Sequence, residues 1–144
     1  MTERAPLREV TLVLPMAPDM ELVASQAGSA LANFVGMSAD RVDEVRMAVV
    51  EACINSFEHS RSSDRRVTLT FRVWGDVAPD RLEIRVHDDG VGFVPEQVEE
   101  PRIERKIGDE RKRGWGLKII QGLMDEVRIQ SSSHGTTVIM SKSR

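Results

Sequence analysis

Apolar and polar residues alternate between positions 7 and 15, where Pro15 ends the run. A period of two residues predicts a strand, and the proline is typical of a strand at the edge of a sheet. From Asp19 to Gly36 the spacing becomes helical. The apolar positions of this segment recur every three or four residues, at Leu22, Val23, Ala27, Ala30, Leu31, Phe34 and Val35. We therefore expect a helix that begins near Asp19 and that Gly36 ends.

A second helix is predicted from Ser38 to about Ser60. Ser38 is a favourable N-cap, and Asp40 places negative charge near the positive end of the helix dipole. Apolar or small residues cover one broad side of the helical wheel, namely Val42, Val45, Val49, Val50, Ala52, Cys53, Ile54, Ser56 and Phe57. The remaining stripe is polar and holds Glu44, Glu51, Asn55, Glu58 and His59. One side of this helix should therefore face a core.

The rest of the chain predicts four more strands and one more helix. Strict alternation predicts strands at 67–73, 82–86, 127–129 and 138–140. Helical spacing returns at Leu117, Ile120, Leu123 and Met124. Residues 94–113 show no apolar period, and a loop of that length in a small domain is usually functional or disordered. Because helices and strands are segregated along the chain, we expect an α+β fold. Its form would be a two-layer sandwich with a mixed, mostly antiparallel sheet and the helices on one face.

Composition narrows the classes of function. The 144 residues are 40% hydrophobic and 30% charged, which fits one soluble domain over residues 1–144. A net charge of -3 and an aromatic content of 4% argue against a direct nucleic-acid surface. No run approaches the roughly 18–20 apolar residues that cross a membrane, and the N-terminus lacks a signal-peptide pattern. The one cysteine, Cys53, cannot form an internal disulfide, which fits a reducing cytoplasm.

Glu51 and Asn55 stand four residues apart on the second predicted helix, so their side chains should point the same way. An amide oxygen is a suitable ligand for Mg²⁺. A carboxylate beside it could act as a general base. The alternative is a polar helix stripe that is simply solvated.

The segment Asp88-Asp89-Gly90-Val91-Gly92 follows a predicted strand. Glycines let the backbone approach a ligand closely, and a carboxylate at the strand end can accept a hydrogen bond from an exocyclic amine such as adenine N6. The alternative is a hairpin turn, because Asp-Gly is a strong turn signal.

Gly114 and Gly116 are predicted to precede the last helix directly. Free N–H groups at a helix N-terminus favour a bound phosphate, and Arg113 adds positive charge. The alternative is a flexible, charged linker. Neither a Walker loop nor a dinucleotide-binding fingerprint is present, because the residues and context that each requires are missing. A last candidate is Thr136, whose hydroxyl could support an adenine contact, although Gly135-Thr136 also suits a plain turn.

These four segments, in this order, resemble the nucleotide-binding boxes of a superfamily with the Bergerat fold. That superfamily contains gyrase, ninety-kilodalton heat-shock chaperones, histidine kinases and mismatch-repair ATPases. The matching pattern is Glu-x-x-x-Asn, Asp-x-Gly-x-Gly, Gly-x-Gly-Leu and Gly-Thr. Within the superfamily, the chain is similar to the single-domain anti-sigma factor serine kinases, notably at 122–127 and 135–138.

The resemblance implies a cytoplasmic kinase that uses ATP and Mg²⁺. Such kinases phosphorylate a serine on a small anti-anti-sigma antagonist of the STAS type, sequester a sigma factor or similar regulator, and act as homodimers. In this chain Asn55 would ligate Mg²⁺, Asp88 would bind adenine and Glu51 would accept the serine proton. Further nucleotide contacts would come from Gly90, Gly92, Arg113, Gly114, Gly116, Leu117 and Thr136. Residues 94–113 would form a lid over the phosphates.

Two other functions remain open from the sequence. One is a non-catalytic module whose nucleotide state sets which partner it binds. The other is the detached ATPase domain of a histidine kinase, although the residues before Val42 contain no histidine that could accept phosphate.

Overall fold

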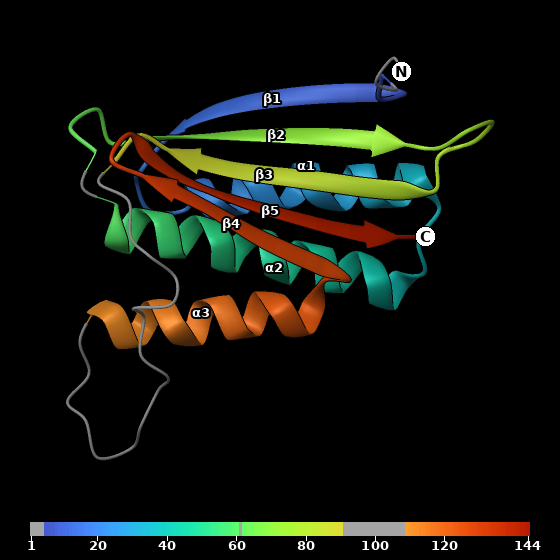
Figure 1. Ribbon diagram of the computed structural model, residues 1–144. Helices are drawn as coiled ribbons and strands as arrows, with labels where there is room; N and C mark the ends of the chain where they lie inside the picture. The colour runs from blue at the N-terminus through green and yellow to red at the C-terminus, as the bar shows by residue number, and fades with distance from the viewer. Residues whose placement is uncertain (1–4, 61, 91–108) are drawn as a thin grey trace.

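The computed structural model describes residues 5–60, 62–90 and 109–144. Five strands form one sheet, and three helices cover one of its faces (Figure 1). The elements are β1 (Arg8–Pro15), α1 (Met20–Val35), α2 (Ala39–His59), β2 (Arg66–Trp74), β3 (Arg81–Asp88), α3 (Asp109–Leu123), β4 (Glu126–Ser132) and β5 (Gly135–Ser143). This order confirms the predicted α+β, two-layer architecture.

The sheet has the order β1-β2-β3-β5-β4, with β1 at an edge as Pro15 predicted. All four strand pairings are antiparallel, so the described sheet is antiparallel throughout rather than mixed. The reason lies in the connection after β3. The crossover through α3 makes β4 run in the same direction as β3, but β5 lies between them and pairs antiparallel with both.

Local signals set the ends of the first two helices as predicted. Gly36 ends α1 in the left-handed region at φ 91°, where a side chain would be strained. Ser38 caps α2, and its side chain accepts a hydrogen bond from the Arg41 backbone N–H at 3.3 Å. The two helices therefore meet at a short, well-defined connection.

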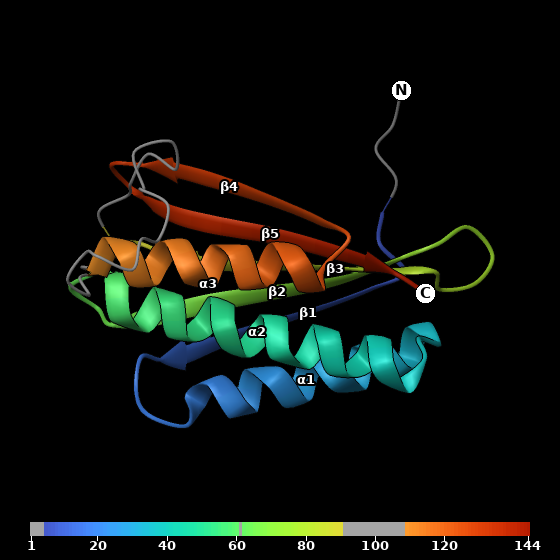
Figure 2. The same ribbon diagram turned by 90° about the horizontal axis from the view of Figure 1, so that it is seen from below.

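Figure 2, which is seen from below, shows the three helices side by side in front of the sheet, with α2 between α1 and α3. The core lies between the layers. Its largest fully buried side chains are Phe71, Leu69, Leu82, Ile84, Ile120, Met140, Val35, Val45, Val49, Val67, Val73 and Cys53. The opposite face of the sheet is polar, with an ion-pair ladder from Glu9 through Arg72 and Glu83 to Arg85. Within the described residues, no helix has the length and hydropathy to cross a membrane.

The start of α3 differs from the prediction. The helix begins at Asp109, so Gly114 and Gly116 lie inside it and do not precede it. Each glycine costs a helix only about 1 kcal/mol, which packing of the buried residues Leu117 and Ile120 can outweigh. The glycine pair therefore does not mark the N-terminus of the helix, contrary to the sequence prediction. Of the predicted lid, 109–113 belong to α3, and 94–108 lie outside the described residues.

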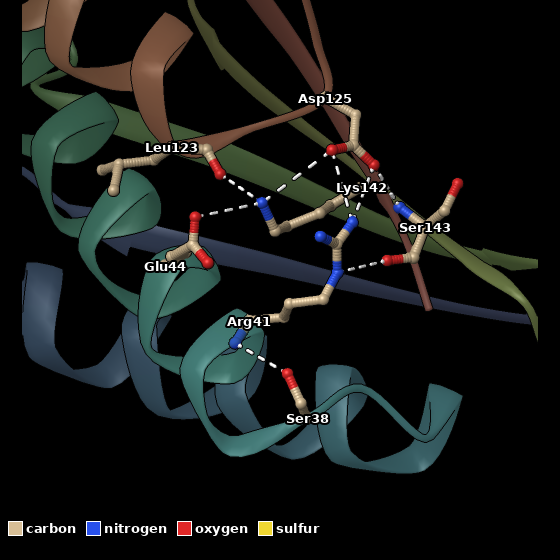
Figure 3. A network of polar contacts seen from close by, with 7 residues as sticks. All are labelled: Ser38, Arg41, Glu44, Leu123, Asp125, Lys142 and Ser143. Atoms are coloured by element: carbon tan, nitrogen blue, oxygen red, sulfur yellow. Dashed lines mark hydrogen bonds and ion pairs between the residues drawn. The ribbon is translucent and has the colours of Figure 1, made fainter.

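A second group of polar residues connects the C-terminal end of α3 to the sheet and to α2 (Figure 3). Buried Lys142 on β5 donates to the Leu123 carbonyl at the end of α3, and it lies 3.4 Å from Glu44 on α2. Asp125 accepts hydrogen bonds from Arg41 and from the Ser143 backbone N–H. We call these residues, Arg41, Glu44, Asp125 and Lys142, the brace.

Candidate functional site

The carboxylate of Asp88 lies at the end of β3 and points into the helix layer. Its Oδ2 accepts a hydrogen bond from Ser56 Oγ at 3.0 Å. Its Oδ1 accepts two more, from Ser60 Oγ and from the Gly90 backbone N–H, each at 3.0 Å. Ser56, Ser60 and Asp88 expose 6%, 7% and 6% of their surface. This buried acidic group therefore accepts three hydrogen bonds from the described residues.

The strand alternation separates Asp88 from its neighbours. His87 lies on the opposite face of β3, where its ring nitrogens contact Thr137 Oγ1 at 2.7 Å and Asp89 Oδ1 at 2.8 Å. Asp89 is exposed and Asp88 is buried. Because β3 already pairs with β2 and β5, a tight hairpin after Asp88 is excluded. The structure therefore favours Asp88, and not Asp89, as the residue that faces a ligand site.

Glu51 and Asn55 meet α3 at Gly116. A Cβ placed on Gly116 would lie 3.6 Å from Asn55 Oδ1 and 3.7 Å from Glu51 Oε1. The two side-chain oxygens therefore converge on one point, as the spacing of four residues predicted. Asn55 is buried and Glu51 is half-buried, so these two residues do not form a solvated stripe. The arrangement joins an amide oxygen and a carboxylate beside a glycine that adds no side chain.

The start of β5 closes the site from the other side. Thr136 pairs with Asp88 in the sheet register, and its Oγ1 lies 3.2 Å from Ser131 Oγ. Gly135 has φ 140°, and a Cβ there would fall on the Asp88 carbonyl oxygen. Only glycine fits this approach of the two backbones. Gly135-Thr136 thus forms the turn that was the alternative to an adenine contact, and it also lies beside Asp88.

The other predicted nucleotide-binding residues are Gly90, Gly92, Arg113, Gly114 and Leu117. Gly90 binds Asp88 through its backbone, and Leu117 is buried one residue beyond Gly116. Gly92 lies outside the described residues. Arg113 and Gly114 lie in α3, and the contacts that were predicted for them remain predictions.

Ser56 and Ser60 are the functional candidates that sequence reasoning missed. The helical wheel places Ser56 on the apolar side of α2, and Ser60 only marks the predicted end of that helix. Both hydroxyls in fact bond to Asp88. The available signal was their spacing of four residues directly after Asn55, which places the two hydroxyls on one face of the helix but does not indicate what that face contacts.

Cys53 does not take part in this chemistry. Burial, with a smaller contribution from the negative charge of Glu21, raises the pKa of its thiol to about 12. The thiol therefore stays protonated and is a poor nucleophile at neutral pH. Its side chain packs in the hydrophobic core.

The comparisons with known proteins agree with this geometry. Residues 16–142 match the family model described as a histidine kinase-like ATPase domain, which spans nearly every described element. The chain belongs to this family. The superfamily and the fold that the four sequence boxes implied are thereby confirmed.

Curated relatives narrow the assignment. The serine-protein kinase RsbW of Bacillus subtilis (strain 168) is 31% identical over 137 residues, which cover 92% of this chain and 84% of the relative. The serine-protein kinase RsbW of Listeria innocua is 29% identical over 140 residues, covering 93% of this chain and 86% of the relative. The chain therefore belongs to the RsbW group of the family.

Solved structures support the fold independently of sequence. The RsbU and RsbW domains of Rv1364c from Mycobacterium tuberculosis match with a TM-score of 0.68 at 19% identity. That match covers 98% of this chain but only 34% of the solved chain, so this chain spans about a third of it. A blue-light activated histidine kinase domain from Erythrobacter litoralis EL346 matches with a TM-score of 0.51 at 17% identity, covering 90% of this chain and 61% of that one.

Proposed function

We propose that this member of the RsbW group is an ATP-dependent serine kinase that regulates a partner protein. The substrate would be a serine on a small STAS-type anti-anti-sigma antagonist, and the partner a sigma factor or similar regulator. The kinase would act in the cytoplasm as a homodimer of single domains, residues 1–144, with a lid at about 94–113.

The observation that carries the proposal is the convergence of Glu51 and Asn55 at Gly116, on the helix that also supplies Ser56 to the buried Asp88 cluster. Phosphoryl transfer depends mainly on positioning the reactants and stabilising charge. One carboxylate, one metal ligand and a segment that closes over the phosphates would therefore suffice for the reaction.

The residues present fit ATP and Mg²⁺. Asn55 offers a hard oxygen donor, which Mg²⁺ prefers, and the bound ion would neutralise charge on the phosphates. Asp88 offers an acceptor for the adenine amine. Gly116 adds no side chain beside Asn55 and Glu51. The remaining nucleotide contacts would come from Gly90, Gly92, Arg113, Gly114, Leu117 and Thr136.

Glu51 would act as the general base. Its carboxylate would take the proton from the substrate serine as the serine oxygen bonds to the γ-phosphorus. The bond from that phosphorus to the bridging oxygen breaks, and ADP leaves with the electron pair. Removing a general base typically lowers the rate by about 10²–10⁴-fold.

The test combines labelled ATP with a candidate antagonist and the variant Glu51→Gln. We expect acid-stable label on a serine with the wild type, a rate at least about 100-fold lower with the variant, and unchanged ATP affinity. Glu58→Gln is the matched control, because Glu58 is an exposed carboxylate on the same helix.

Three results would contradict the proposal. Full transfer by Glu51→Gln would exclude Glu51 as the base. A partner that binds differently with and without ATP, but never gains label, would identify a nucleotide-gated switch. Acid-labile phosphate on the product would instead support a histidine-kinase type of reaction.

A further inference from the structure

The donors that hold Asp88 limit what else this carboxylate can bind. A carboxylate offers about four lone-pair positions, two on each oxygen. Ser60 and Gly90 fill both positions on Oδ1, and Ser56 fills one on Oδ2. Among the described residues, no donor fills the second acceptor position on Oδ2. That position suits a single N–H donor.

The direction of one serine hydroxyl follows from its other contact. Ser60 Oγ accepts a hydrogen bond from the Ser62 backbone N–H at 3.2 Å. Its own proton is therefore available to Asp88 Oδ1, with which it forms a 3.0 Å contact. Ser56 lies one helical turn earlier and approaches the other carboxylate oxygen. Each oxygen of Asp88 thus has its own hydroxyl from the same face of α2.

All three donors described for Asp88 are neutral groups. A hydroxyl or an amide orients a carboxylate without cancelling its negative charge, whereas an arginine or lysine would neutralise it and offer spare donors. The remaining position on Oδ2 is therefore an acceptor in a negatively charged setting. It attracts an amine and repels a carbonyl oxygen.

We propose that Ser56 and Ser60 are positioning residues that set the base specificity of the nucleotide site, by keeping Asp88 an acceptor with one free position. This inference rests on the proposed function, since it concerns the same nucleotide. A purine with an amino group at position 6 can donate to Oδ2. A purine with an oxo group there presents a second acceptor and leaves the buried carboxylate position unpaired, which disfavours binding.

We expect Ser56 and Ser60 to contribute unequally to the base specificity. Oδ2 has Ser56 as its described protein donor, whereas Oδ1 keeps the Gly90 N–H when Ser60 is removed. Losing Ser56 frees the oxygen that would face the base, so Asp88 can turn. We therefore expect Ser56→Ala to change specificity more than Ser60→Ala.

The experiment compares Mg-ATP with Mg-ITP, its 6-oxo counterpart, by titration calorimetry on the full chain. The variants are Ser56→Ala, Ser60→Ala, the double variant and Ser60→Thr, which restores a hydroxyl. Ser25→Ala is the matched control, because it removes another buried serine hydroxyl, one that bonds to the Leu22 carbonyl at 2.9 Å in α1.

For the wild type we expect a clear preference for ATP. The double variant should lower the ratio of ATP to ITP affinity by about tenfold or more, through weaker ATP binding and unchanged or stronger ITP binding. Ser56→Ala should account for most of this change, Ser60→Thr should restore the wild-type ratio relative to Ser60→Ala, and Ser25→Ala should leave it unchanged.

The outcomes separate the inference from the proposed function. If the double variant binds both nucleotides more weakly but keeps the wild-type ratio, the serines are merely structural and the inference is overturned. If the wild type itself binds no ATP, the proposed function fails, and the inference fails with it.

Discussion

Two aspartates at opposite ends of α2 are held in contrasting ways. Asp88 is buried and bonds to neutral donors, two of them serines near the C-terminal end of α2. Asp125 is largely exposed and bonds to Arg41, near the N-terminal end of that helix, with Lys142 at 3.9 Å. Arg41 and Ser56 are roughly 22 Å apart along the helix, at about 1.5 Å per residue.

The difference follows from what each carboxylate must do. Cations around Asp125 neutralise its charge, so this carboxylate joins α2, β5 and the end of α3 but has little left for a ligand. Neutral donors around Asp88 fix its direction and leave its charge and one acceptor position available. We infer that the first arrangement serves the fold and the second serves binding.

The largest expected effect comes from Asp88→Asn. The amide removes the negative charge and presents N–H groups in place of one acceptor oxygen, so the adenine amine loses its partner. We expect ATP affinity to fall by at least about 100-fold, measured by calorimetry. Circular dichroism and urea unfolding should show an intact fold, because the serine hydroxyls can turn to accept from the amide. Near-normal ATP binding would contradict the assignment of Asp88.

A smaller effect, on stability instead of binding, is expected from Lys142→Met. Methionine keeps most of the buried volume but removes the donor to the Leu123 carbonyl and the contact with Glu44. Leaving the part-buried Leu123 carbonyl without this donor costs about 1–3 kcal/mol, which urea unfolding would measure. ATP affinity should stay within about twofold of wild type. A large loss of affinity without a loss of stability would show that the brace belongs to the binding site.

The smallest expected effect is the pH dependence of Asp125→Asn. The hydrogen bond from the Ser143 N–H, together with Arg41 and Lys142, holds the pKa of Asp125 below its ordinary value. A lowered folded-state pKa means that the charged form stabilises the fold above the unfolded pKa, near 4, and that this stability is lost as pH falls through the folded pKa.

The variant should therefore be less stable than wild type by about 0.5 kcal/mol at neutral pH, as expected for an exposed ion pair. Urea unfolding at a series of pH values should show this difference shrinking below about pH 4. A difference that is constant down to acid pH would mean that the charge of Asp125 contributes nothing.

The site was predicted from sequence to different extents. Glu51 and Asn55 could be paired because helical spacing alone fixes their direction. Asp88 could be proposed from its place at a strand end, but its serine partners come from a helix 28 and 32 residues away in sequence, and no local pattern records that contact. The start of α3 was misplaced because glycine is a weak helix breaker and packing overrode it.

The sequence by itself determined the elements, their order and the four boxes, because period, caps and turn residues act over a few positions. The tertiary structure alone decided that β5 lies between β3 and β4, that Gly116 rests against Glu51 and Asn55, and that Asp88 is held by Ser56 and Ser60. These contacts depend on how the helix layer packs on the sheet. That packing brings together residues that are distant in the chain.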